Sequence, residues 1–269
     1  MMLQNKIAVI YGAGGSLGGA VSRAFANAGA KLFLTGRDIS SVQKVADEIT
    51  ASGGVVEIAE VDALDEKGVH RHMEEVVRKA GTVDISFNAI GLEDTQDIPL
   101  VNMQLEDFIR PITRAMQTQF LTATAAGRAM MKQSSGVILS LTATPGGIGY
   151  PNVGGFGPAC CAMESFSRNL ASELGVHGIR VVNIRSAGSP DSRVFKEAID
   201  KGGEQIMAVI KRLEADTMLK TLPLMEDIAN TAVFLSSSMA AKTTGVTIDV
   251  TCGTTSALNH IVGTIPFGR

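Results

Sequence analysis

The sequence predicts an α/β fold: a doubly wound parallel sheet of about seven strands with helices on both faces. Three observations indicate this fold. Short, wholly apolar runs such as Ile7–Ile10 are typical of strands buried on both faces. Amphipathic helical stretches alternate with these runs, and a glycine-rich turn at 12–19 separates the first run from the first helical stretch. Because no linker or repeat interrupts the series, we expect one domain spanning 1–269.

Strands and helices are expected to alternate along the chain, joined by right-handed crossovers. The expected strands are Ile7–Ile10, Lys31–Thr35, Val55–Val61, Val83–Phe87, Val137–Leu141, Ile179–Ile184 and Val246–Val250. The expected helices are Leu17–Asn27, Ser40–Thr50, Glu66–Lys79, Gln104–Met131 and a segment that follows Pro158. Gly29 and Gly81 follow helix ends, where a left-handed residue is favoured. Pro111 predicts an early kink or break in the long helix.

Composition and charge limit the classes of function. The formal net charge is -3 at pH 7, which argues against nucleic acid as a partner, because that needs a basic surface. Three cysteines, two of them adjacent, make a poor disulfide framework, and no spacing is typical of a zinc site. Neither a signal peptide nor an apolar run of about 20 residues is present, so we expect a cytoplasmic protein without membrane contact.

The glycine-rich turn between the first strand and the first helix predicts a dinucleotide site. Its candidate cofactor contacts are Gly12, Gly14, Gly15, Ser16, Leu17 and Gly18. Glycines let the backbone approach a pyrophosphate, and the helix N-terminus presents free N–H groups to the phosphate charge. The alternative is a cluster of turn glycines without a ligand, although four glycines are more than a turn needs.

The residues that end the second and third strands indicate which dinucleotide would bind. Gly36 stands where an acidic residue would hold the ribose hydroxyls of NAD, and Arg37 follows it. Because a guanidinium suits a 2′-phosphate, we expect NADP(H) in preference to NAD(H); the alternative is a solvated surface arginine. Asp62 and Ala63 after the third strand, and Asn88 at the end of the fourth, are further candidate cofactor contacts.

Taken in order, these motifs resemble those of the short-chain dehydrogenase/reductase family over about Gln4–Ser256. The first turn is similar to the family's TGxxxGxG, with Tyr11 for Thr and Ser16 for the middle Gly. The segment 88–91 is similar to NNAG, with Ala89 for the second Asn, and Gly188 falls where a Pro-Gly pair precedes the nicotinamide contacts. The resemblance therefore adds Ala89 and Gly188 to the candidate cofactor contacts. The resemblance implies a Rossmann-like fold, hydride transfer and a homo-oligomer, either a tetramer or a dimer.

The resemblance also locates the chemistry that the family uses. There a Tyr acts as general acid/base, a Lys lowers its pKa, a Ser orients the carbonyl and an Asn supports a proton relay. The positions that match Asn, Ser, Tyr and Lys are held by Ala115 (or a neighbour), Ala143, Phe156 and Cys160. The chain has only two tyrosines, and neither is followed by a lysine four or seven residues later. None of the usual catalytic residues is therefore expected.

Other side chains are candidates for the missing roles. Tyr150, in the loop after the fifth strand, is a candidate acid; the alternative is a tyrosine that packs on the pocket wall. Cys160 and Cys161 are either nucleophiles at a helix N-terminus or small buried residues. The segment 190–222 is the expected substrate lid, and the tail 257–269 is suited to pack on a neighbouring subunit. The apolar side chains of the lid, which helix packing explains equally well, are Phe195, Ile199, Ile206, Met207, Ile210 and Leu213.

Three functions stay open from the sequence. The first is an NADP(H)-binding oxidoreductase of atypical mechanism, whose small-molecule substrate is a small or medium apolar carbonyl or enone. Hydride transfer needs only a positioned nicotinamide, so a pre-activated or conjugated acceptor fits this hypothesis. The second is a catalytically silent nucleotide-binding homologue, either a pseudoenzyme or a structural subunit. The third is a non-redox enzyme that reuses the cleft.

Overall fold

The structure is a computed structural model that describes residues 1–257, the side chain of Val194 excepted. The strands of this part are β1 (Ile7–Tyr11), β2 (Lys31–Gly36), β3 (Val55–Glu60), β4 (Ile85–Asn88), β5 (Gly136–Ala143), β6 (Ile179–Ser186) and β7 (Thr247–Val250). Its α-helices are α1 (Ser16–Asn27), α2 (Ile39–Ala51), α3 (Glu66–Ala80), α4 (Leu105–Gln133), α5 (Phe156–Leu174), α6 (Arg193–Ala215) and α7 (Met225–Ser236).

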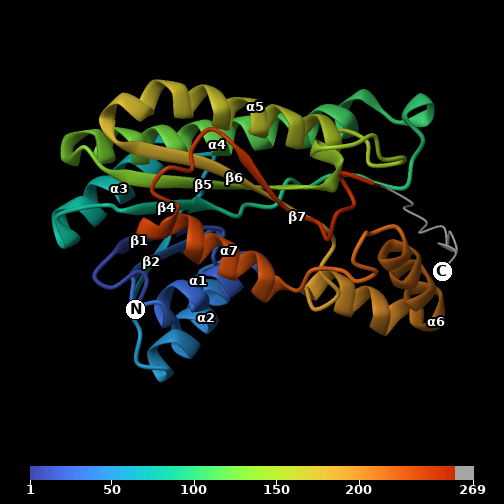
Figure 1. Cartoon of the computed structure of the whole chain (residues 1–269), viewed down its shortest axis with the longest axis horizontal. Helices are drawn as coiled ribbons and strands as arrows, with labels where there is room; N and C mark the ends of the chain where they lie inside the picture. The colour runs from blue at the N-terminus through green and yellow to red at the C-terminus, as the bar shows by residue number, and fades with distance from the viewer. Residues whose placement is uncertain (258–269) are drawn as a thin grey trace, which may run out of the picture.

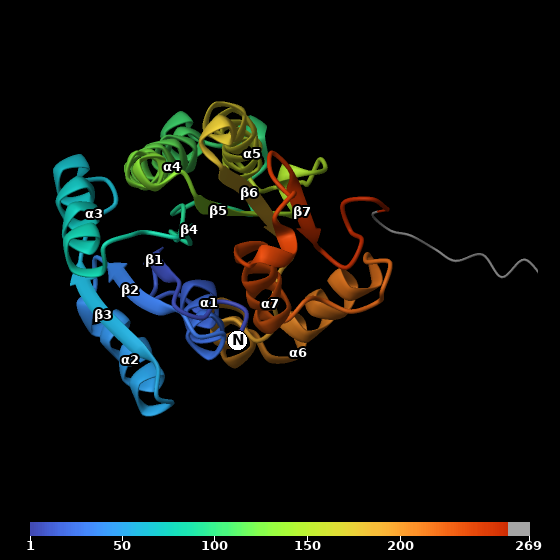
Figure 2. The same cartoon turned by 60° about the vertical axis from the view of Figure 1, so that its left-hand side comes forward.

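The described strands form one parallel sheet in the order β3-β2-β1-β4-β5-β6-β7. Helices α1, α2 and α7 cover one face, and α3, α4 and α5 cover the other (Figures 1 and 2). The predicted fold class is confirmed. The strand order reverses between β1 and β4, and ligands of such sheets bind at the carboxyl ends of the strands beside that reversal.

Two apolar clusters, one on each face, hold the helices to the sheet. On the first face Phe25 of α1 and Ile228 of α7 are fully buried against strand residues such as Ile10. On the second face Met73 of α3 and Met130 of α4 pack on the other side of the same strands. Strands buried on both faces need apolar residues at every position, which explains why the sequence runs showed no alternation.

Most predicted boundaries lie within two or three residues of the observed ones, and the differences have local causes. Strand β4 begins at Ile85 rather than Val83, because the Asp84 carboxylate accepts a hydrogen bond from the backbone N–H of Ile7 at 2.9 Å. Of the kink or break expected at Pro111, the break was wrong: α4 continues through this residue, which is buried in its second turn. A proline so near the start of a 29-residue helix removes one backbone bond and leaves the later turns intact.

The segment expected to form a lid is largely α6, which projects beyond the end of the sheet (Figure 1). Gly203 divides this helix, with φ 49° and ψ −124°, a conformation that glycine adopts without strain. The predicted subunit-packing tail lies outside the described residues, Ala257 excepted. Among residues 1–257 no helix combines the length and the apolar character that a membrane span requires.

Candidate functional site

A cavity of about 370 Å³ lies at the switch point, where β1, β2, β3 and β4 end. The structure brings together seven of the predicted cofactor contacts in its lining: Gly12, Gly14, Gly15, Arg37, Asp62, Ala63 and Ala89. Thr35, Glu93, Arg114, Thr118 and Arg193 also contribute to it. We call this the switch-point cavity. Its wall combines glycine backbone with arginine side chains, which is the chemistry that a phosphorylated nucleotide requires.

The glycine turn is shaped by its own close contacts. Gly12 has φ +79°, and a Cβ on Gly18 would lie 2.2 Å from the Gly12 carbonyl oxygen, so neither position accepts a side chain without a shift of backbone. Helix α1 begins after Gly15, whose position provides no side-chain cap. The first N–H groups of α1 therefore have no capping side chain, and they fit a pyrophosphate at this end of the helix.

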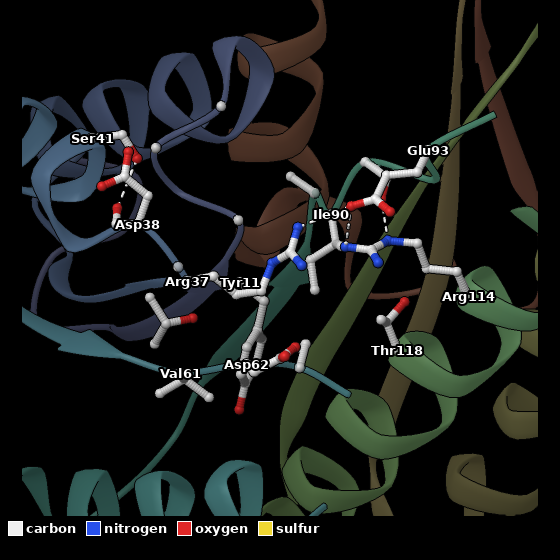
Figure 3. Close-up of a pocket in the computed structure, with 18 of the residues that line it drawn as sticks. Tyr11, Arg37, Asp38, Ser41, Val61, Asp62, Ile90, Glu93, Arg114 and Thr118 are labelled. Atoms are coloured by element: carbon white, nitrogen blue, oxygen red, sulfur yellow. Dashed lines mark hydrogen bonds and ion pairs between the residues drawn. The ribbon is translucent and has the colours of Figure 1, made fainter. Parts of the chain in front are cut away.

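The acidic residues near this cavity are partly committed to the backbone. Asp38 caps α2, and hydrogen bonds from Ser40, first among them the one from its hydroxyl, lower the Asp38 pKa. Asp62 lines the cavity, while its Oδ1 accepts from the backbone N–H of Leu64 at 3.0 Å. In contrast, the side chain of Arg37 extends across the cavity (Figure 3).

Arg37 and Arg114 converge on one carboxylate. Nη2 of Arg37 lies 2.9 Å from Oε1 of Glu93, and Nη2 of Arg114 lies 3.0 Å from the same oxygen (Figure 3). Arg114 also donates through Nε to the Gly91 carbonyl at 3.0 Å. Sequence reasoning did not single out Glu93 or assign Arg114 a role. The only signal was their position, one beyond the 88–91 motif and the other beside Ala115.

Five predicted cofactor contacts lie outside the lining of the switch-point cavity: Ser16, Leu17, Gly18, Asn88 and Gly188. Ser16 Oγ accepts from the backbone N–H of Arg193 at 3.0 Å and so joins the glycine turn to the start of α6. The Asn88 side chain is buried, donating to Thr122 Oγ1 and accepting from the N–H of Ile90, both at 3.0 Å. Asn88 thereby anchors the end of β4 to α4.

A second cavity, of about 300 Å³, lies where β5 and β6 end. Its lining includes Gln96, Ala143, Tyr150, Phe156 and Gly188, together with Phe195, Leu213, Asp216 and Leu222 of the lid segment. Two other predicted lid residues do not line this cavity: Ile210 is buried, and Met207 is exposed. Ala143 of β5 and Phe156 of α5, two of the positions that match the family's catalytic residues, therefore line the same cavity as part of the lid segment.

Around the second cavity the side chains are mostly apolar. Ala115 is fully buried in a small cluster against which the Phe156 ring packs. Cys160 is 1% exposed, and burial raises the pKa of its thiol to about 12. A thiol with this pKa is protonated near neutral pH, which favours the alternative of a small buried residue over that of a nucleophile for Cys160. Cys161, by contrast, is exposed, and neither cysteine lies in the first turn of α5.

Tyr150 is the one tyrosine of the chain that lines the second cavity. Burial, and then the negative charge of Asp216, raise its pKa, while the Arg212 guanidinium opposes them. Both leading effects disfavour the phenolate, so the hydroxyl keeps its proton at neutral pH. Tyr150 can therefore donate a hydrogen bond to a group in this cavity.

A largely buried network of charged and polar side chains joins β5, β6 and α5. Arg185 binds Glu164 through two bonds, Nε to Oε1 at 2.9 Å and Nη2 to Oε2 at 2.6 Å. Thr142 donates to Glu164 at 2.9 Å, and Asp249 lies 3.1 Å from Nη1 of Arg185. Sequence reasoning missed this network, because its members lie far apart in the sequence and show no common motif.

The parallel sheet, its switch point and the glycine turn define the class of fold, the α/β fold of dinucleotide-binding domains. A family model described as enoyl-(acyl carrier protein) reductase matches residues 12–255. Because this match covers most of the chain, the protein belongs to the short-chain dehydrogenase/reductase family of oxidoreductases.

Individual relatives match over nearly their whole length. The 3-oxoacyl-[acyl-carrier-protein] reductase FabG of Escherichia coli (strain K12) is 28% identical over 94% of this chain and 98% of its own. The 3alpha-hydroxysteroid dehydrogenase of Mediterraneibacter gnavus is 30% identical over 93% of this chain and 97% of its own. Among solved structures, NAD+-bound xylitol dehydrogenase superposes with a TM-score of 0.87 at 22% identity, covering 94% of this chain and 100% of that one. At that identity the structural likeness shows the fold.

Proposed function

We propose that the protein is an NADP(H)-dependent oxidoreductase that acts on a small or medium apolar carbonyl or enone by an atypical mechanism. The observation that carries this proposal is the placement of Arg37 and the glycine turn in one cavity at the switch point. The turn fits a pyrophosphate, and a guanidinium at the end of β2 suits a 2′-phosphate better than a ribose diol.

When bound, the dinucleotide supplies a hydride, and the residues of this chain position it and the acceptor. The free N–H groups at the start of α1 would hold the phosphates, and Arg37 would bind the 2′-phosphate. Ala89 lines the switch-point cavity and Gly188 lines the second cavity, where the substrate would bind. The apolar walls of that cavity, which include Phe156, Phe195 and Leu213, exclude water and favour an apolar acceptor.

The atypical step in this proposal is proton delivery. We infer that Ala115, Ala143, Phe156 and Cys160 take the places of the residues that perform acid–base chemistry in the family. A phenylalanine ring has no proton to exchange, and a buried thiol with a pKa of about 12 carries no charge to lower the pKa of a neighbour. A conjugated or pre-activated acceptor, whose reduction needs less help from an acid, fits such a site.

Tyr150 is the proposed source of the proton. Tyr150→Phe is expected to abolish turnover while leaving NADPH affinity unchanged, because the ring stays and only the hydroxyl is lost. A general acid works in its protonated form, and the Tyr150 pKa is raised from its ordinary value of 10.0. The wild-type rate should therefore be level through neutral pH and fall only above about pH 10. A rate that Tyr150→Phe leaves intact would remove this residue from the mechanism.

The function is tested by mixing the purified protein with NADPH and a panel of aldehydes, ketones and enones, and following cofactor absorbance. Oxidation of NADPH by at least one class of acceptor is expected. Tight NADPH binding without turnover of any acceptor would favour the second candidate, a catalytically silent nucleotide-binding protein. The apolar cluster around Ala115 and Phe156 is the observation that favours that candidate.

We also propose that the protein is a homo-oligomer, a dimer or tetramer that pairs its long helices. Helix α4 exposes Leu105, Ile109 and Phe120, and Phe120 packs at 6.4 Å on Phe166 of α5. Apolar side chains gathered on one outer face are typical of an interface. Light scattering on the eluted protein is expected to give two or four times the mass of the 28.2 kDa chain. A monomer at micromolar concentration would contradict this expectation.

A further inference from the structure

The carboxylate of Glu93 forms an ion pair with Arg37, the residue that would bind the 2′-phosphate in the proposed function. Arg37 approaches it from the end of β2 and Arg114 from α4, and both bind its Oε1 (Figure 3). The two cations differ in freedom: the Arg37 side chain is 55% exposed, whereas that of Arg114 is 12% exposed. Arg37 can therefore leave this pair more easily than Arg114 can.

The backbone holds Glu93 in this position. Its φ is 55°, in the left-handed region that side chains other than glycine rarely adopt. The Glu93 carbonyl accepts from Nε of Arg110 at 3.1 Å, and Arg110 is itself bound to Thr95 and Asp107. A strained residue persists only where its surroundings determine it, and such residues concentrate at ligand sites.

We propose that Glu93 is a specificity-determining residue, an internal anion that NADP(H) must displace from Arg37 with its 2′-phosphate. This inference rests on the proposed function. A phosphate monoester carries more charge and more acceptor oxygens than a carboxylate, so it takes the guanidinium in exchange. The ribose diol of NAD(H) carries no charge and leaves the pair in place. Glu93 stays bound to Arg114 after the exchange.

The proposal predicts a selective gain when the carboxylate is neutralised. Glu93→Gln frees Arg37 and removes a negative charge from beside the phosphate. The pair is half-exposed, so the expected effect is modest: the Kd of a 2′-phosphorylated adenosine should fall about fivefold. A nucleotide without the 2′-phosphate should change by less than about twofold, because it does not depend on Arg37.

The experiment uses two fragments that isolate the adenosine half of the site, adenosine 2′,5′-bisphosphate and adenosine 5′-diphosphate. Each is titrated by calorimetry, at low salt, into the full chain as wild type, Glu93→Gln and Asp94→Asn. Asp94→Asn is the matched control, since it removes one charge from the next residue, whose carboxylate accepts from Gln96. The Arg37→Gln and Arg37→Gln/Glu93→Gln variants complete a double-mutant cycle.

Glu93→Gln is expected to bind the bisphosphate about fivefold more tightly than the wild type does, with little change for adenosine 5′-diphosphate. Asp94→Asn should show no such gain in affinity, and the gain should disappear when Arg37→Gln is also present. Three results would overturn this inference while leaving the proposed function standing, provided that both fragments bind the wild type. Glu93→Gln could show unchanged affinity for the bisphosphate, an equal gain in affinity for both fragments, or the same affinities as Asp94→Asn. If neither fragment nor NADPH binds any variant, the proposed function fails, and the inference fails with it.

Discussion

Replacing Glu164 with glutamine is expected to lower the free energy of unfolding by about 3 kcal/mol. The Glu164 side chain is 6% exposed and that of its partner Arg185 is 15% exposed. Glutamine keeps the shape and one acceptor oxygen, but it loses the negative charge and the second acceptor, so the two-bond contact with the Arg185 guanidinium is lost. Asp249, at 3.1 Å from Nη1, compensates only in part. Denaturant unfolding followed by circular dichroism measures the change.

The matched control is Glu48→Gln, because Glu48 binds Arg23 at a similar distance of 2.9 Å on the surface. Both side chains of that pair are well exposed, at 39% and 59%, so its loss should cost less than about 1 kcal/mol. Equal losses for the two variants would mean that burial of the Glu164 network contributes nothing beyond a surface pair. That result would contradict the role assigned to the network here.

Replacing Arg37 with glutamine is expected to weaken NADPH binding about thirtyfold and NADH binding less than about twofold. A hydrogen bond between charged groups contributes about 1.5–3 kcal/mol, and glutamine keeps neither the charge nor the forked geometry. NADH offers hydroxyls at the same place and gains little from a cation. Fluorescence titration with each cofactor measures both affinities.

Arg23→Gln is the control for Arg37→Gln. It removes one positive charge from α1, on a side chain that does not line the switch-point cavity. If the two substitutions weaken NADPH binding to the same small extent, Arg37 acts only through the overall charge. If Arg37→Gln weakens NADH as much as NADPH, the arginine does not read the 2′-phosphate.

The sequence predicted the sheet, the helices and the glycine turn because these depend on local patterns. Apolar runs, helix-ending glycines and the turn at Gly12 each act over fewer than about fifteen residues. Parallel connectivity then places the ends of β1 and β2 together, so Gly12 and Arg37 had to lie near each other. Their shared cavity follows from topology rather than from any long-range contact.

The Glu93 pair and the Glu164 network could not be predicted in the same way. Glu93 pairs with Arg37 from a backbone in the left-handed conformation, and no local residue pattern predicts that conformation for a glutamate. Glu164 and Asp249 meet at Arg185 from α5 and β7, which lie far apart in the chain. Contacts of this kind depend on tertiary packing. From sequence alone, a charged side chain is expected to lie on the surface, because most charged residues do.

The most direct test of the account is a paired titration of the wild-type protein with NADPH and NADH in the same buffer and at the same salt concentration. Saturable binding of NADPH at least about tenfold tighter than that of NADH is expected, because Arg37 lines the switch-point cavity, where the proposed function places the 2′-phosphate. Equal affinities, tighter binding of NADH, or no binding of either cofactor would contradict it.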